Sequence, residues 1–272
     1  MIPALDPQAA LAALAWQIGM GADEAICDAP VNRFAAPGPP AVAAARAAPV
    51  AAEAPAPPVV APQVADSTPD PVAAAEAAAR SAPDLAALAA AMAAFPHCAL
   101  RQGARNCVFA DGRPGARVMI VGEAPGSEED QRGLPFVGRA GQLLDRMLAA
   151  IDMRRDHPDP GRAVYITNVL PWRPPGNRTP TPEECAMMLP FLARHVELAA
   201  PDILVLMGNT PTRALLGPGG ILRRRGIWVR ALDRPALPMV HPAYLLRTPS
   251  AKREAWTDLL SLQARLRQPG DS

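Results

Sequence analysis

From residue 117 onward, short apolar runs alternate with amphipathic segments. The runs cover residues 118–121, 164–167, 203–207 and 237–240, a length typical of buried strands. Apolar residues recur at spacings of three and four from about Gly141, and further helices are predicted from Thr181, from Thr210 and around Trp256. Continuous apolar strands that alternate with helices indicate a parallel sheet covered on both faces. We therefore expect a three-layer α/β/α domain with a central four-stranded parallel sheet.

The composition changes upstream of this domain. Residues 29–72 are mostly Ala, Pro and Val, and a stretch so poor in large side chains cannot offset its ordering entropy, which predicts a disordered linker. A short helix is predicted within residues 1–28, and an Ala-rich helix over 73–94 leads into the domain. The catalytic domain is expected to span residues 95–268, so that the N-terminal extension is largely disordered.

Charge and cysteine usage narrow the class of partner and the compartment. The net charge is −6 over residues 1–94 and +7 over residues 95–272, and a basic domain suits a phosphate-bearing partner. The four cysteines have no regular spacing, which favours a reducing compartment over a disulfide framework. No apolar run is long enough to span a membrane, and no basic leader precedes an apolar stretch. We expect a cytoplasmic, nucleoid-associated monomer without a membrane partner.

Polar side chains follow each of the four predicted strands. The first strand runs into Gly122 and Glu123, the second ends at Asn168, the third at Asn209 and the fourth at His241. Ligands of open parallel sheets bind at the carboxyl ends of the strands, so we expect these residues to line one site. Each residue alone fits a structural role as well, because Asn forms turns and a single His often packs in a core. The combination favours a functional site.

These residue types suit the hydrolysis of an N-glycosidic bond. A carboxamide presents a donor and an acceptor side by side, which can read the edge of a nucleobase. An imidazole can donate to an oxygen that gains negative charge, while a carboxylate can hold a water or stabilise a cation-like sugar. Phe136, in a loop after the first strand, is available to stack on a base, although packing against the core is an equally good interpretation.

Four motifs carry a resemblance to a known family. The first covers residues 122–130 (GEAPGSEED) and continues in residues 133–138 (GLPFVG). The others are residues 167–169 (TNV), 173–178 (RPPGNR) and 241–247 (HPAYLLR). In this order and spacing, from about residue 95 to 266, the sequence resembles the family 4 uracil-DNA glycosylases. The resemblance implies their α/β fold and an enzyme that flips uracil out of DNA and hydrolyses its glycosidic bond.

The resemblance implies a role for each residue of the base pocket. Glu123 would shape the pocket beside the scissile bond, and Glu129 would orient water or guard the C5 edge of the base. Phe136 would stack on uracil, Asn168 would pair with its edge and reject cytosine, and His241 would stabilise the departing anion at O2. The surrounding loop would be formed by Gly122, Ala124, Pro125 and Gly126.

A second group of residues is expected to contact DNA. The resemblance implies that Leu245, Leu246 and Arg247 enter the duplex and fill the gap left by the extruded nucleotide. For the leucines, packing of the last helix is the alternative. Contacts to phosphates are expected from basic residues near the same edge of the sheet. These residues are Arg173, Arg178, Arg223, Arg224 and Arg225.

The resemblance fails at the positions of the family's 4Fe–4S cluster. Family 4 enzymes hold the cluster with four cysteines, and here the corresponding positions are occupied by Phe95, Cys98, Trp172 and Met188. One thiolate cannot hold a cubane that needs four soft ligands. We expect no cluster, and we expect these large side chains to fill its volume by apolar packing instead.

Three functions are therefore compared. The first is a metal-independent glycosylase acting on uracil in single- or double-stranded DNA. The second is a non-catalytic binder of damaged or single-stranded DNA that uses the same pocket. The third, a nucleotide-phosphate enzyme built on the 122–126 loop, is disfavoured because no Gly-Lys-Ser/Thr follows and Glu123 would repel phosphate.

Overall fold

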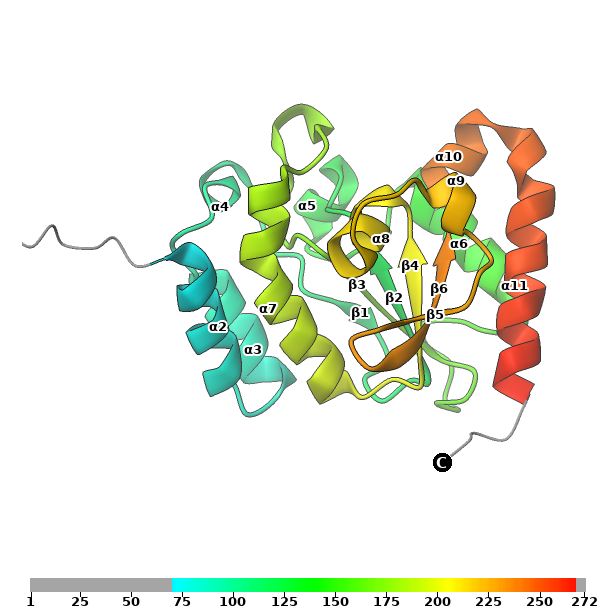
Figure 1. Cartoon of the computed structure of the whole chain (residues 1–272), viewed down its shortest axis with the longest axis horizontal. Coiled ribbons are helices and arrows are strands. Elements are labelled where there is room, and N and C mark those ends of the chain that lie inside the picture. Colours follow the sequence, from blue (N-terminus) through cyan, green and yellow to red (C-terminus); the bar gives the residue numbers. More distant parts are fainter. Residues whose placement is uncertain (1–69, 268–272) are drawn as a thin grey trace, which may run out of the picture. The chain divides into compact units, whose positions relative to one another are not determined.

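The structure is a computed structural model that describes residues 70–267 (Figure 1). The strands are β1 (Asp111–Gly112), β2 (Val118–Gly122), β3 (Val164–Asn168), β4 (Ile203–Met207), β5 (Val229–Ala231) and β6 (Arg234–Met239). The longer helices are α2 (Pro71–Ser81), α3 (Leu85–Ala94), α6 (Arg139–Ala149), α7 (Pro182–Ala199), α8 (Asn209–Leu216) and α11 (Lys252–Arg267). Short helical turns are α4 (Leu100–Gly103), α5 (Ser127–Arg132), η1 (Pro175–Asn177), α9 (Ile221–Arg224), α10 (Pro242–Arg247) and η2 (Pro249–Ala251). The helix predicted within residues 1–28 and the linker up to residue 69 lie outside the described residues.

The sheet has the order β1-β3-β2-β4-β6-β5, and its four inner strands run parallel. These are the four strands that the apolar runs predict, and that prediction is confirmed. The expectation of a sheet with only four strands was wrong, because β1 and β5 pair antiparallel at its two edges. Both edge strands are short and only partly buried, so neither produces an apolar run in the sequence.

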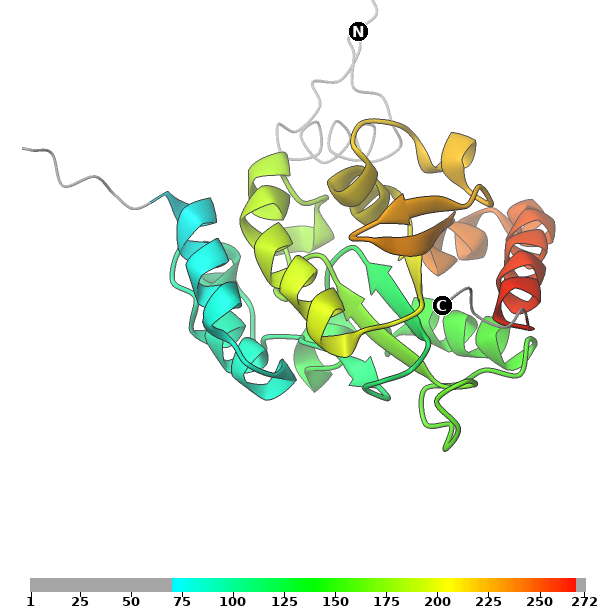
Figure 2. The ribbon, with the colours of Figure 1, turned by 60° about the horizontal axis from the view of Figure 1, so that its bottom comes forward.

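Helices cover both faces of the sheet, which confirms the three-layer arrangement (Figure 2). Alternate side chains of each strand point to opposite faces. On β2, Val118 and Ile120 belong to the core shared with α6 and α11, whereas Met119 and Val121 belong to the core shared with α7. No helix within residues 70–267 combines the length and apolar character needed to cross a membrane.

The segment leading into the domain is two helices, not the single helix that we expected over residues 73–94. Pro83 follows α2, and because the residue before a proline avoids the helical region, Ala82 is extended and α2 ends there. Asp84 then caps α3 through the backbone N–H of Ala87 at 2.8 Å. The predicted linker is also too long by three residues, because Asp70 caps the start of α2. Both helices pack against α7 (Figure 1).

Helix α7 starts with the capping box that the sequence predicts. The hydroxyl of Thr181 accepts the N–H of Glu184 at 3.2 Å, and the Glu184 carboxylate accepts the N–H of Thr181 at 2.8 Å. Further along α7, the buried ring of His195 stacks on Phe109, with centroids 4.2 Å apart, and its Nε2 lies 3.0 Å from the Tyr165 hydroxyl. Burial lowers the pKa of His195 to about 3.

This buried histidine predicts a loss of stability in mild acid. Below about pH 6.5, His195 is protonated in the unfolded chain but stays neutral in the folded chain. The free energy of unfolding therefore falls as the pH decreases. At about pH 5 the loss should be roughly 2 kcal/mol. In His195→Gln, the drop in unfolding free energy between neutral pH and pH 5 should be smaller by about that amount. Urea unfolding at the two pH values measures it, and an equal drop in both proteins would contradict the prediction.

Candidate active site

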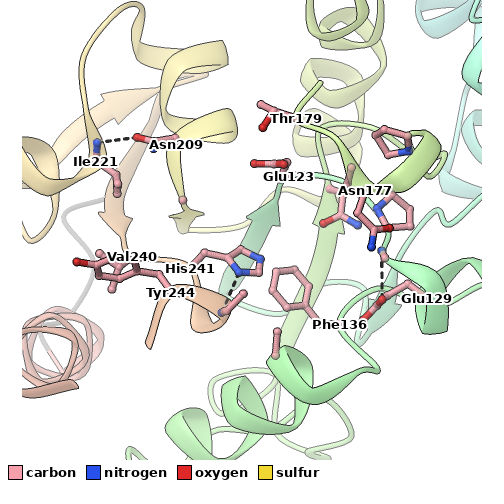
Figure 3. A pocket seen from close by; sticks show the side chains of 18 of the residues that line it. Glu123, Glu129, Phe136, Asn177, Thr179, Asn209, Ile221, Val240, His241 and Tyr244 are labelled. Carbon is pink, nitrogen blue, oxygen red and sulfur yellow. Dashed lines mark hydrogen bonds between the residues drawn. The ribbon is translucent and has the colours of Figure 1, made fainter. Parts of the chain in front are cut away.

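A cavity of about 640 Å³ opens at the carboxyl ends of the parallel strands (Figure 3). This volume lies in the range of small-molecule binding pockets. The residues predicted for the site that line it are Glu123, Ala124, Pro125, Gly126, Glu129, Phe136, Asn168, Arg178, Asn209, His241 and Arg247. The predicted residues that do not line it are Gly122, Arg173, Arg223, Arg224, Arg225, Leu245 and Leu246. The structure therefore brings together the residues predicted to contact the base and only part of those predicted to contact DNA.

Strand pairing places Gly122 next to Asn168, which lines the cavity. They are paired residues at the carboxyl ends of the adjacent strands β2 and β3, and Asn168 is only 8% exposed. A Cβ on Gly122 would overlap Asn168 Oδ1 and would lie 2.5 Å and 2.7 Å from two ring carbons of Phe136. Glycine at this position is thus what allows the amide and the aromatic ring to approach the same point.

The Glu129 carboxylate holds the loops that surround the cavity. One oxygen accepts the N–H groups of Val137 at 3.0 Å and Gly138 at 2.9 Å, and the other accepts the N–H of Gly126 at 3.1 Å. The predicted role of Glu129 was to orient water or guard the base. That role stays a prediction. The contacts show that its two oxygens accept three backbone N–H groups, so that Glu129 also positions the Phe136 loop.

Phe136 is held from the other side by Arg155. The backbone of Phe136 has φ 54°, in the left-handed region that non-glycine residues rarely adopt. The Arg155 guanidinium donates to the carbonyl oxygens of Pro135 at 2.8 Å and Phe136 at 2.6 Å and pairs with the carboxylates of Asp111 and Asp145. These bonds hold the ring in a fixed position against the cavity. No motif in the sequence pointed to Arg155.

The Glu123 carboxylate, which follows β2, is held by Thr210, which follows β4. The hydroxyl of Thr210, at the start of α8, donates to Glu123 Oε2 at 2.5 Å. Among residues 70–267, the second oxygen of Glu123 has no hydrogen-bond partner. A carboxylate held by one oxygen keeps the other available for a water or a cation-like centre. Thr210 was missed in the sequence, although its position three residues after β4 could have suggested it.

His241 presents a neutral hydrogen-bond donor. Its Nδ1 accepts the N–H of Ala243 at 3.1 Å, which places the proton of the neutral ring on Nε2. The pKa of His241 is lowered to about 4, chiefly by burial and also by the charge of Arg247, while Glu129 opposes the shift. The ring stacks on Phe136 with centroids 5.2 Å apart, and Glu123 lies across the cavity from both rings (Figure 3).

The basic residues divide into two groups. Arg178 lines the cavity and donates to both oxygens of Glu184 at 2.9 Å and 2.6 Å, and Arg247 also lines it. Arg173 donates to the side chain of Asn177. Arg223 is exposed at the surface. These four keep access to solvent at or near the cavity.

We expected Arg223, Arg224 and Arg225 to contact phosphates, but two of them bind groups of the protein itself. Arg224 donates to the carbonyl oxygens of Leu216 at 2.9 Å and Pro218 at 2.7 Å. Arg225 pairs with the buried carboxylate of Asp258 at 2.5 Å. Both guanidinium groups are thereby turned toward the protein.

The prediction that Leu245, Leu246 and Arg247 enter the duplex needs correction at Leu245. Its side chain is 1% exposed and packs with Ile221, Val240 and Ala255, so it belongs to the core and cannot enter a duplex. Leu246, at 36% exposed, and the exposed Arg247 remain accessible. The helical turn of α10 forces this division, because adjacent residues on a helix point in different directions.

The four positions that the resemblance assigns to cluster ligands meet in one apolar core. Phe95, Cys98, Trp172 and Met188 are all buried and share a cluster with Phe191. This donor set does not fit a 4Fe–4S cluster, because it offers a single thiol and burial raises the pKa of that thiol. Within residues 70–267, no group of His, Cys, Asp and Glu side chains is arranged to hold a metal ion.

Comparison with known proteins agrees with this geometry. The uracil DNA glycosylase superfamily profile matches residues 109–260. A type-4 uracil-DNA glycosylase of Thermotoga maritima is 41% identical over 156 residues, which is 56% of this chain and 78% of that protein. One of Sulfurisphaera tokodaii is 37% identical over 166 residues, which is 57% of this chain and 73% of that protein. The chain therefore belongs to the uracil DNA glycosylase superfamily and, within it, to the type-4 family.

Proposed function

We propose that the protein excises uracil from DNA by hydrolysing the N-glycosidic bond. The observation that carries this proposal is that three side chains face one cavity: the neutral imidazole of His241, the carboxamide of Asn168 and the carboxylate of Glu123. Only one oxygen of that carboxylate accepts a hydrogen bond from the described residues. Hydrolysis separates a cation-like sugar from an anionic base, so it needs a donor at the base oxygen and an acceptor near the sugar.

The residues divide these tasks. Phe136 offers its face for stacking, and the Asn168 amide pairs with the polar edge of uracil. The Nε2–H of His241 donates to the oxygen that gains charge as the bond breaks. The free oxygen of Glu123 holds the attacking water and stabilises the developing positive charge on the sugar.

The test uses an oligonucleotide with one uracil, incubated with the protein in EDTA and then treated with alkali. We expect strand scission at the uracil, and we expect Asn168→Ala to lose most of it. A gel shift of the same oligonucleotide without scission would reject the enzyme in favour of the non-catalytic binder.

The hydrogen bond between Thr210 and Glu123 predicts different excision rates for two substitutions of Thr210. Thr210→Val removes the donor that fixes the carboxylate and should lower the single-turnover rate of excision by about tenfold, the loss expected for a hydrogen bond to a charged group. Thr210→Ser keeps the hydroxyl and should retain most of the rate. A loss in Thr210→Ser with little loss in Thr210→Val would show that the methyl group, and so packing, is what matters.

We also propose that the protein folds and acts without an iron–sulfur cluster. Phe95, whose ring packs edge to face on Phe191 with centroids 5.3 Å apart, supports this, because apolar contacts occupy the ligand positions. Phe95→Ala should lower the free energy of unfolding by about 3–5 kcal/mol in urea titrations. Iron analysis of purified wild-type protein should find none, and about four irons per chain would contradict the proposal.

We further propose that the protein acts as a cytoplasmic monomer on single- or double-stranded DNA. The support is that Cys98, Cys107 and Cys185 are free thiols, as in a reducing compartment. Arg178, Arg247 and Arg223 keep access to solvent and can contact phosphates. Sedimentation of the protein with and without a uracil-containing oligonucleotide tests the stoichiometry.

A further inference from the structure

An exposed leucine stands beside the cavity on the turn α9. Leu222 is 61% exposed and lines the cavity, whereas its neighbour Ile221 is buried against Val240 and Leu245. Large apolar side chains on a surface are ordinary when scattered, but this one lies at the rim of a binding cavity. Its exposure follows from the short helical turn, in which Ile221 anchors the segment and Leu222 points outward.

The turn that carries Leu222 is rigidly attached to the domain. The side-chain oxygen of Asn209 accepts the N–H of Ile221 at 2.8 Å. Arg224 closes the preceding loop through the carbonyl oxygens of Leu216 and Pro218, and Arg225 ties the end of the turn to Asp258 on α11. A surface group held in place before binding loses little freedom when a ligand arrives. The two arginines that we first expected on phosphates thus hold Leu222 in position.

Leu222 is shared with a second, shallower hollow next to the first. This hollow, of about 370 Å³, is lined by Leu222, Tyr244, Thr248, Ser250, Ala251 and Glu254. Leu222 and Tyr244 line both the hollow and the cavity, so the two spaces adjoin at these side chains. Two adjoining spaces of this kind suit two neighbouring nucleotides of one strand.

The chemistry of the hollow suits a nucleobase and not a phosphate. Leu222 and the Tyr244 ring offer apolar and aromatic surface, on which any base can pack. Thr248 and Ser250 carry hydroxyl groups for the polar edge of a base. The Glu254 carboxylate, 3.6 Å from Arg225, repels an anion and accepts from the amino groups of a base.

We propose that this hollow binds the base of the nucleotide adjacent to the flipped uracil in the same strand, with Leu222 and Tyr244 as its contact surface. The proposal rests on the proposed function. It makes Leu222 a residue that contacts a nucleotide other than the flipped uracil.

The experiment combines a protein variant with a change in DNA. Wild type, Leu222→Ala and the control Leu260→Ala, which truncates a leucine 42% exposed on α11, are compared on single-stranded oligonucleotides. One oligonucleotide has normal bases around uracil, and two others carry an abasic analogue at the 5′ or the 3′ neighbour. Both kcat/KM for excision and affinity by fluorescence anisotropy are measured.

We expect Leu222→Ala to lower kcat/KM and affinity by about fivefold to tenfold on the normal strand, as expected for the loss of one base contact. The loss should vanish on the strand that lacks the base on one side, and Leu260→Ala should behave as wild type. No loss, or an equal loss on all three strands, would overturn the proposal. Wild type that excises no uracil would reject the proposed function instead, and the affinities would still test the hollow.

Discussion

His241→Ala should lower the single-turnover rate of uracil excision by about 10²–10³-fold, the loss typical of removing one preorganised donor from a developing anion. The imidazole is neutral, its Nδ1 is engaged by the N–H of Ala243, and its Nε2–H is the donor that remains. Alanine leaves the departing base without that donor. Single-turnover excision of a uracil-containing oligonucleotide measures the effect.

The pH dependence separates a neutral donor from a cationic one. Because burial lowers the pKa of His241 to about 4, the ring stays uncharged through the neutral and mildly acidic range. The ratio of wild-type to His241→Ala rates should therefore be constant between about pH 5.5 and 8. A ratio that changes around pH 6.5 would show that the ring titrates as an ordinary histidine and would contradict this mechanism. His157→Ala, on a surface turn away from the cavity, is the control.

Gly122→Ala should abolish most of the activity although it adds a single methyl group. The new Cβ would overlap Asn168 Oδ1 and approach the Phe136 ring carbons at 2.5 Å and 2.7 Å, so both side chains must move. Displacing groups that orient a substrate by about 1 Å can cost on the order of 10²-fold in rate. Excision kinetics at saturating protein measure the loss.

A matched glycine distinguishes a local effect from a loss of stability. Gly103, on α4, has no atom within 4 Å of an added Cβ, so Gly103→Ala should keep full activity. Gly122→Ala should also remain folded at the assay temperature, as followed by thermal melting. Near-normal activity of Gly122→Ala would mean that Asn168 and Phe136 are free to shift, and that the cavity is less rigid than the structure shows.

Local patterns predicted the elements that bury apolar residues continuously. The four parallel strands follow from apolar runs, and the start of α7 follows from Thr181 and Glu184, whose bonds lie within one helical turn. The edge strands β1 and β5 were missed because they are too short and too polar to leave a pattern. Pro83 and Asp84, which divide the first helical segment, are a local signal that was overlooked.

The gathering of Glu123, Asn168 and His241 could be predicted because parallel strands end at a common edge. The task of each side chain could not, because it depends on partners far away in the chain. Thr210 lies 87 residues from Glu123, and Arg155 lies 19 residues from Phe136. Tertiary packing likewise placed Arg225 on Asp258 and Leu245 in the core.

By itself, the sequence determined the layered α/β fold, the edge of the sheet that carries the site and the presence of a single cysteine at the four positions that the resemblance assigns to cluster ligands. Each of these depends on residue type and local spacing. Only the tertiary structure decided which carboxylate keeps a free oxygen, which nitrogen of His241 carries the proton, and which leucines stay exposed near the cavity. Those properties are set by contacts between distant segments, and hydrogen-bond geometry and burial are defined only once the chain is folded.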